Sequence, residues 1–142
     1  MSQILDASMA LAWLFIRSNV GEAELARKAL SQLHLTPTVV PPLWFSEIAN
    51  GVLRGERAGI VTREKASFFL DELAHANVAT DFEPPASRQA SVLTLARAHG
   101  LTAYDAVYLD LTLRTKGFIA TFDRQLAEAT RKAGARVFGD LA

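Results

Sequence analysis

The chain of 142 residues is 50% hydrophobic and 21% charged, a composition that excludes a disordered or polyelectrolyte protein and predicts a single domain, residues 1–142. Its 15 Lys and Arg residues balance its 15 Asp and Glu residues, so no overall positive field would attract nucleic acid. The chain has no cysteine for a disulfide, a thiolate metal site or a nucleophile, and no apolar run near the roughly 18 residues of a membrane span, so we expect a cytoplasmic protein with no membrane contact.

Apolar runs of strand length alternate with longer segments of helical periodicity, which is typical of β/α units around a parallel sheet. The predicted fold class is α/β, an α/β/α sandwich whose central parallel sheet has short strands. In chain order, we predict strand 3–5, helices 7–16 and 21–33, strand 38–40, helices 42–58 and 62–75, strand 77–80, helices 85–99 and 102–115, strand 117–121, helix 123–132 and strand 136–138.

Helix 42–58 has the clearest periodicity. Phe45, Ile48, Ala49 and Val52 recur at intervals of three and four residues, which predicts a stripe that faces the core. Gly100 stands where the cap at the carboxyl end of helix 85–99 belongs.

Four acidic residues stand at the beginnings of predicted helices: Asp6, Glu47, Asp105 and Asp123. Three of these helices follow predicted strands directly or after a turn. In an open parallel sheet such positions gather beyond the carboxyl ends of the strands, where ligands bind in these folds. The sequence therefore predicts a site with several carboxylates at one edge of the sheet.

Each acid alone also has a local structural explanation. Asp6 and Asp123 could be helix N-caps, whose carboxylates accept backbone N–H groups. Thr102 and Asp105 have the spacing of a capping box, and Glu47 could simply interact with the dipole of its helix. The apolar neighbours of Asp105 and Glu47 favour a site over ordinary surface charge.

Carboxylates that share a crevice repel one another and are pushed toward protonation unless a cation lies among them. Their hard oxygen atoms suit Mg²⁺ or Mn²⁺. Such cations activate water, orient phosphate groups and stabilise the leaving oxygen of an in-line displacement. The chemistry that these residues indicate is cleavage of a phosphodiester bond.

Four segments carry a family resemblance: ILDASMALAWLF, PPLWFSEIANGVL, LTAYDAVYLDLTLR and FIATFDRQLAEA. In this order and spacing they resemble the four acidic motifs of PIN domains, especially of toxins of the VapC type, over nearly the whole chain. The resemblance implies a single PIN domain whose four acids are catalytic and bind Mg²⁺ or Mn²⁺. It also implies supporting roles for Thr121 and Ser8, whose hydroxyls match positions that orient a carboxylate or a metal-bound water, with a purely structural role as the alternative.

The mechanism implied by the resemblance is attack of a metal-activated water on RNA, which leaves a 5′-phosphate and a 3′-hydroxyl. The resemblance further implies a homodimer and a cognate antitoxin protein whose carboxyl-terminal segment blocks or fills the active groove. Some PIN proteins carry another acid just beyond the last motif, where this chain has Arg124 and Gln125. Both one and two metal ions therefore stay open.

Because the net charge is zero, RNA binding must depend on a local basic patch. Arg54, Arg57, Arg63 and Lys65 are candidates for a basic rim that contacts phosphates. The alternative is that these four side chains form an ordinary solvated surface.

Two other enzyme classes fit the sequence less well. An aspartyl-phosphate phosphatase would also place an acid after the first strand, but it would need a second acid at the position of Ser8. Nucleotide binding through a Walker loop or a GxGxxG turn is excluded, since neither motif follows a strand. A non-catalytic RNA- or protein-binding module on a PIN scaffold stays open as the alternative function.

Overall fold

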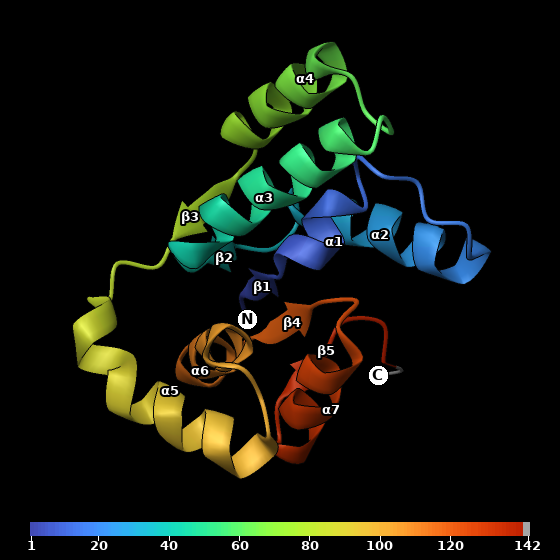
Figure 1. Cartoon of the computed structure of the whole chain (residues 1–142). Helices are drawn as coiled ribbons and strands as arrows, with labels where there is room; N and C mark the ends of the chain where they lie inside the picture. Colours follow the sequence, from blue (N-terminus) through green and yellow to red (C-terminus); the bar gives the residue numbers. More distant parts are fainter. Residues whose placement is uncertain (141–142) are drawn as a thin grey trace.

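The computed structural model describes residues 1–140 and contains one five-stranded sheet in the order β3-β2-β1-β4-β5 (Figure 1). Every neighbouring pair of strands is parallel, which confirms the predicted fold class. Residues 141–142 of the predicted domain lie outside the described residues. The strands are β1 (Gln3–Leu5), β2 (Thr38–Val40), β3 (Val78–Thr80), β4 (Phe118–Ala120) and β5 (Arg136–Val137).

The helices connect the strands in the predicted order, and helices flank the sheet (Figure 1). Except for the first helix, the observed bounds differ from the predicted ones by no more than two residues. The helices within residues 1–140 are α1 (Ala7–Leu11), α2 (Val20–Gln32), α3 (Leu43–Arg57), α4 (Arg63–Ala74), α5 (Pro85–His99), α6 (Ala103–Thr115) and α7 (Arg124–Lys132).

The prediction that the first helix extends to residue 16 is wrong, because α1 ends at Leu11. The chain continues in tight turns, in which Trp13 N–H donates to the Ala10 carbonyl and Leu14 N–H to the Leu11 carbonyl. This path lets the Trp13 indole N–H donate to the Ala26 carbonyl of α2 at 2.8 Å. A tertiary contact therefore replaces the helix that local periodicity predicts.

The predicted core-facing stripe of α3 needs a similar correction. Ile48 and Val52 are buried as predicted, but Phe45 is 52% exposed and Ala49 is also exposed. Trp44, at 2% exposure, takes the place in the core that the prediction gave to Phe45. The buried stripe of α3 therefore begins one residue earlier than predicted, at Trp44 instead of Phe45.

The order of the strands in the sheet reverses at β1, because later strands are added on both sides of it. From β1 the chain adds β2 and then β3 on one side, whereas β4 and β5 are added on the other side. In Figure 1 the segment from β1 to α4 and the segment from α5 to β5 therefore form two halves that meet where β1 pairs with β4. The carboxyl ends of β1 and β4 border the crevice in which open α/β sheets bind ligands.

Gly117 permits the close approach of β4 to β1. A Cβ atom at this position would lie 2.3 Å from the Ser2 carbonyl oxygen, a distance that only glycine avoids without a backbone shift. The neighbouring Phe118 N–H donates to the same oxygen at 3.0 Å. The hydrogen-bonded start of the β1–β4 pair therefore depends on the absence of a side chain.

Ion pairs also join the second half of the chain to the end of β3. Arg88 of α5 binds both carboxylate oxygens of Asp110 on α6, at 3.0 and 2.7 Å. Arg114 of α6 donates to Asp110 at 3.1 Å and to Asp81, directly after β3, at 2.7 Å. These ion pairs fix the position of α6, which carries one of the candidate acids.

No helix of residues 1–140 has the length and hydropathy that a membrane span requires.

Candidate active site

Asp6 directly follows β1 and lies at the crevice between β1 and β4. Its carboxylate Oδ2 accepts hydrogen bonds from Thr121 Oγ1 at 2.5 Å and from Ser8 Oγ at 2.7 Å. Its side chain makes no helix-capping hydrogen bond, although Asp6 occupies the N-cap position of α1. The alternative that Asp6 is an ordinary N-cap is therefore wrong, and the two hydroxyls hold the carboxylate in place of backbone N–H groups.

Thr121 and Ser8 belong to a network that connects the ends of the two central strands. The Asp123 N–H donates to Thr121 Oγ1 at 2.9 Å, and the Phe122 N–H donates to Ser8 Oγ at 3.0 Å. Because each hydroxyl accepts from the backbone, it can direct its own proton to Asp6. The network orients the carboxylate across the β1–β4 junction.

Asp123 does cap its helix, as one of the local explanations predicted. Its Oδ1 accepts the Leu126 N–H of α7 at 3.0 Å. The N-cap role fixes the rotation of the carboxylate, and the capping hydrogen bond occupies only one of its two oxygens. Capping and a role in a site are therefore compatible for this residue.

Asp105 lies in the first turn of α6, but a different residue caps that helix. The Thr102 hydroxyl accepts the Asp105 N–H at 3.1 Å, and within residues 1–140 no hydrogen bond joins the Asp105 carboxylate to the Thr102 N–H. The reciprocal bond of a capping box is therefore missing. The Asp105 side chain is only partly buried.

Glu47 lies on α3 and is held by a residue of α6. Tyr108 donates its hydroxyl proton to Glu47 Oε1 at 2.5 Å. The Tyr108 ring is completely buried, and burial raises the pKa of its hydroxyl far above the usual value, so it stays a hydrogen-bond donor. Tyr108 was not among the predicted site residues. Its position three residues after Asp105, on the same face of α6, is the signal that could have identified it.

The acids influence one another electrostatically. Burial raises the pKa of Asp6, which the Thr121 and Ser8 hydrogen bonds lower and the charge of Asp123 raises further. Burial also raises the pKa of Glu47, and the charges of Asp6 and Asp105 add to that effect. These shifts show that the candidate acids share one electrostatic environment.

Among the four candidate acids, the carboxyl group of Asp105 has a pKa shifted toward neutrality. Burial raises the pKa of Asp105 from 3.8 to about 6, and the charges of Asp123 and Asp6 contribute to this rise. A carboxyl group that resists ionisation near neutral pH marks a functional site more often than an ordinary surface. It also marks a place where a positive charge would be stabilised.

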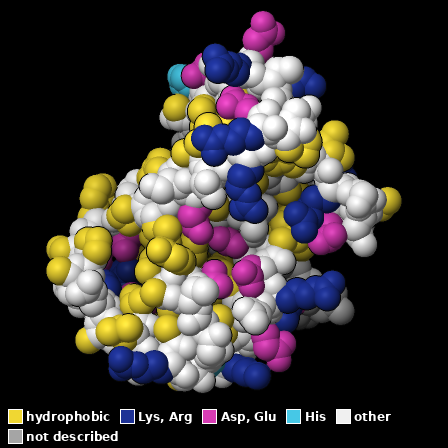
Figure 2. All heavy atoms as spheres, in the orientation of Figure 1, with side chains coloured by type: hydrophobic (Ala, Val, Ile, Leu, Met, Phe, Trp, Pro, Cys, Tyr) yellow, Lys and Arg dark blue, Asp and Glu magenta, His cyan; other side chains and the backbone are white. Residues whose placement is uncertain are grey.

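Figure 2 shows Asp and Glu side chains gathered near the middle of one face, with Lys and Arg side chains beside and above them. Within residues 1–140, however, no three acidic or histidine side chains lie close enough together to hold a metal ion as they stand. The chemistry of the donors nevertheless fits a hard cation, because all four are carboxylates and three of them have pKa values raised in part by neighbouring acids.

Comparisons with known proteins show the family to which the chain belongs. A family model described as PIN domain matches residues 4–132. Ribonuclease VapC3 from Pyrobaculum aerophilum is 34% identical to the chain over 128 residues, which cover 90% of the chain and 94% of that protein. The chain belongs to the PIN domain family. The resemblance seen in the four acidic motifs is thereby confirmed.

Two solved structures share the PIN fold with this chain. The crystal structure of PAE2754 from Pyrobaculum aerophilum has a TM-score of 0.71 and 24% identity, and it covers 97% of this chain and 90% of its own. The FitAcB structure from Neisseria gonorrhoeae has a TM-score of 0.63 and 20% identity, with 96% of each chain covered. At these identities the two structures support the fold alone.

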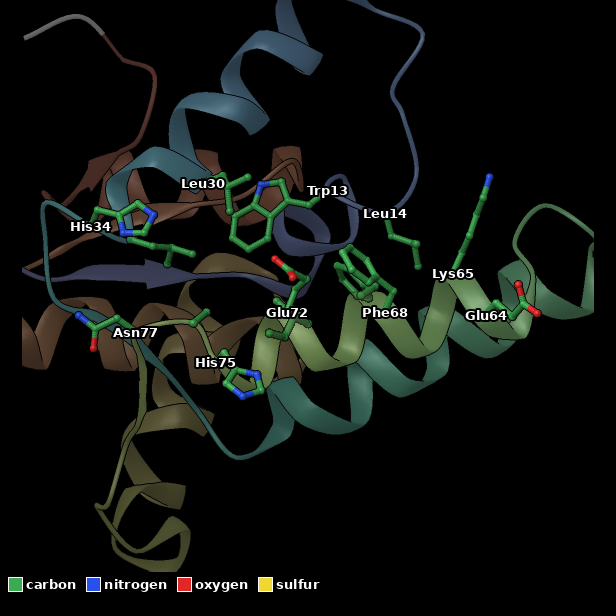
Figure 3. Close-up of a pocket in the computed structure, with 14 residues that line it drawn as sticks. Trp13, Leu14, Leu30, His34, Glu64, Lys65, Phe68, Glu72, His75 and Asn77 are labelled. Atoms are coloured by element: carbon green, nitrogen blue, oxygen red, sulfur yellow. The ribbon is translucent and has the colours of Figure 1, made fainter.

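An apolar groove lies apart from the acids of this PIN domain (Figure 3). Trp13 from the turns after α1 and Leu30 of α2 face Phe68 and Glu72 of α4 across it. Phe68 is 67% exposed and Leu30 is 41% exposed. None of the four candidate acids lines this groove, so it is a second surface feature and not a part of the acidic crevice.

The raised pKa values predict how stability depends on pH. In EDTA, we expect the free energy of unfolding to decrease as the pH rises from about 4 to about 7. The reason is that Asp105 binds its proton more tightly in the folded protein, with a pKa of about 6, than in the unfolded chain. Its contribution is fully present below the unfolded pKa and is lost as the pH passes through the folded pKa.

Urea unfolding at a series of pH values would test this prediction, with the Asp105→Asn variant as the comparison. The variant should show a smaller decrease than the wild type, because it lacks the proton that Asp105 releases. Identical pH dependence in the two proteins would contradict the shift of Asp105.

Proposed function

We propose that the protein is an endoribonuclease that depends on Mg²⁺ or Mn²⁺ and hydrolyses phosphodiester bonds of RNA. The observation that carries the proposal is the set of acids at the β1–β4 crevice, where Asp6 and Glu47 are fixed by hydroxyl donors and carry raised pKa values. The name of the relative Ribonuclease VapC3 supports RNA as the substrate. We propose one catalytic domain for the chain.

The four acids Asp6, Glu47, Asp105 and Asp123 would hold the cation. The cation, when bound, would activate the attacking water and stabilise the charge that develops on the phosphate and on the leaving oxygen. The protein contributes orientation, because each fixed carboxylate loses little entropy on binding. Thr121 acts in this proposal through Asp6, which it orients.

The hydrogen-bond network makes specific contributions to this function. Thr121 and Ser8 orient the Asp6 carboxylate and favour its ionised form, since both hydroxyls donate to the same oxygen. Tyr108 performs the same task for Glu47 from inside the core. Asp123 binds Leu126 N–H through Oδ1 and can direct its other oxygen to the crevice.

We further propose that the enzyme acts as the toxin of a toxin–antitoxin pair, with a cognate antitoxin protein as its partner. The VapC-type motifs and the exposed apolar groove of Figure 3 support this role, because apolar surfaces of this kind are sites for protein partners. A homodimer in the cytoplasm belongs to the same proposal. A non-catalytic RNA- or protein-binding module is the alternative function.

Purified protein incubated with a panel of structured and unpaired RNAs would test the nuclease activity. We expect the wild type to cut RNA in Mg²⁺ or Mn²⁺ but not in EDTA, and Asp105→Asn to cut in none of these conditions. The products should carry 5′-phosphates, which a phosphatase-sensitive end-labelling assay detects. A folded wild type that neither cuts RNA nor binds metal in calorimetry would favour the binding module.

A further inference from the structure

An arginine lies beside the acidic crevice without being one of its candidate residues. The guanidinium carbon of Arg17 lies 4.0 Å from the centroid of the Phe122 ring. Phe122 immediately precedes Asp123, and its backbone N–H donates to Ser8 Oγ, which in turn donates to Asp6. The aromatic ring therefore holds a positive charge next to the residues that support the crevice.

A second arginine lies on α3 in line with Glu47. Arg54 follows Glu47 by two helical turns, so both side chains leave the same face of α3, about 10 Å apart along its axis. Arg54 is exposed, and it makes no ion pair with any residue of the described range 1–140. Its charge is available to a ligand that passes over the acids.

The chain just before Arg17 packs against α3 next to Arg54. A Cβ atom at Gly55 of α3 would lie 2.4 Å from Phe15 Cζ, so the chain after α1 contacts the α3 backbone directly. Arg17 follows Phe15 by two residues and Arg54 directly precedes Gly55, so both arginines lie close in sequence to this contact. Figure 2 shows Lys and Arg side chains beside the central acids and along the surface above them.

The acids alone would repel the strand that they are proposed to cut. RNA carries one negative charge per nucleotide, and this protein has no net charge with which to attract it. A cation in the crevice compensates the charge at the cleaved phosphate only. The phosphates on either side need positive side chains at the rim.

We propose that Arg17 and Arg54 bind the phosphates that flank the cleaved bond of an unpaired RNA strand. This inference rests on the proposed nuclease function and adds two residues that bind its substrate. The side chain of Asp6 is only 6% exposed, so a phosphate must descend into the crevice to reach it. A flexible single strand can bend in this way, whereas a paired helix holds its phosphates in a regular backbone.

Arg17 also has a simpler, structural role that the experiment must separate from RNA binding. Its guanidinium donates to Glu22 at 3.3 Å, an ion pair with 35% and 42% of the two side chains exposed. A purely structural arginine would affect thermal stability but not the salt dependence of RNA binding. The replacement Arg17→Met keeps an unbranched apolar side chain against Phe122 and removes only the charge.

The test measures binding of a short, labelled, unpaired RNA by fluorescence anisotropy at several salt concentrations. EDTA prevents cleavage, so binding is observed whether or not the protein is a nuclease. We compare the wild type with the double variant Arg17→Met/Arg54→Met. The control Arg97→Met/Arg136→Met removes two exposed arginines from α5 and β5 and thus changes the net charge equally. A third double variant, Arg17→Lys/Arg54→Lys, keeps both charges.

We expect the slope of log K against log salt to shrink by about 1.4 in Arg17→Met/Arg54→Met, because each phosphate contact to a single strand contributes about 0.7. The control should keep the wild-type slope, and the lysine variant should recover most of it. A paired RNA hairpin should show little difference between the wild type and the arginine variant.

Equal losses in the two methionine variants, no loss in either, or no RNA binding by the wild type would overturn the inference. An equal loss on the hairpin would overturn the assignment to unpaired RNA. Failure of the proposed function looks different: the wild type would cut no RNA with any metal, while the arginine variant would still bind unpaired RNA with the reduced slope.

Discussion

Asp6→Asn is expected to reduce RNA cleavage by roughly 100-fold or more while leaving the protein folded. The residue is the proposed metal ligand at the centre of the hydroxyl network, and loss of outer-shell partners of metal ligands alone costs about 10- to 100-fold. The amide oxygen of Asn can still accept from Thr121 and Ser8, so the network survives without the charge. Single-turnover cleavage of a short RNA in Mn²⁺ measures the effect.

The same variant should be at least as stable as the wild type in EDTA at neutral pH. Burial raises the pKa of Asp6, which means that the charged carboxylate destabilises the fold above that pKa. Asp71→Asn, which removes an exposed acid on α4, serves as the matched control and should change neither property. If Asp6→Asn kept more than about a tenth of the activity, the proposed role of Asp6 would be wrong.

Asp110→Ala is expected to cost about 2–4 kcal/mol of unfolding free energy, the largest effect on stability that we predict. The Asp110 side chain is only 6% exposed and accepts hydrogen bonds from Arg88 and Arg114. Its removal leaves the partly buried Arg114 with Asp81 as its remaining partner. The estimate lies below the cost of breaking a fully buried pair, because both arginines retain contact with water.

Urea unfolding of Asp110→Ala should be compared with that of Asp140→Ala. Asp140 also binds an arginine with both oxygens, since Arg131 donates to it at 2.9 Å through Nε and through Nη2. Those side chains are 48% and 44% exposed, so the second variant should lose no more than about 1 kcal/mol. Equal losses would mean that burial does not determine the strength of the Asp110 interactions.

The sequence predicted the sheet well because its strands are short apolar runs between clear helix signals. The prediction was wrong where the structure of one segment depends on contacts with another segment that is distant in the chain. The end of α1 depends on contacts such as that of Phe15 with Gly55, which no local period reports. The start of the buried stripe in α3 was shifted because the sequence cannot tell whether Trp44 or Phe45 faces the core.

The same limit applies to the candidate site. The acids could be named from their positions after strands and from the family motifs, and the motifs also named Thr121 and Ser8, which donate to Asp6. The partner of Glu47 could not be named in this way. The Tyr108–Glu47 hydrogen bond joins residues 61 positions apart, and the local pattern around Glu47 does not indicate it. Helix-capping propensity likewise predicted the same role for Asp6 and Asp123. Both occupy N-cap positions, but of the two side chains only that of Asp123 accepts a capping hydrogen bond.

The pairing of β1 with β4 also determines when during synthesis a functional site can exist. The Asp6–Thr121 hydrogen bond joins residues 115 positions apart, and the last candidate acid, Asp123, begins α7. In a chain still emerging from the ribosome, Asp6 would lack the Thr121 hydroxyl that orients it. The reason is that such distant residues can pair only after the chain between them has been made and its loop has closed. Cleavage should therefore appear only after nearly all of the chain has been made, and fragments that end before β4 should be inert.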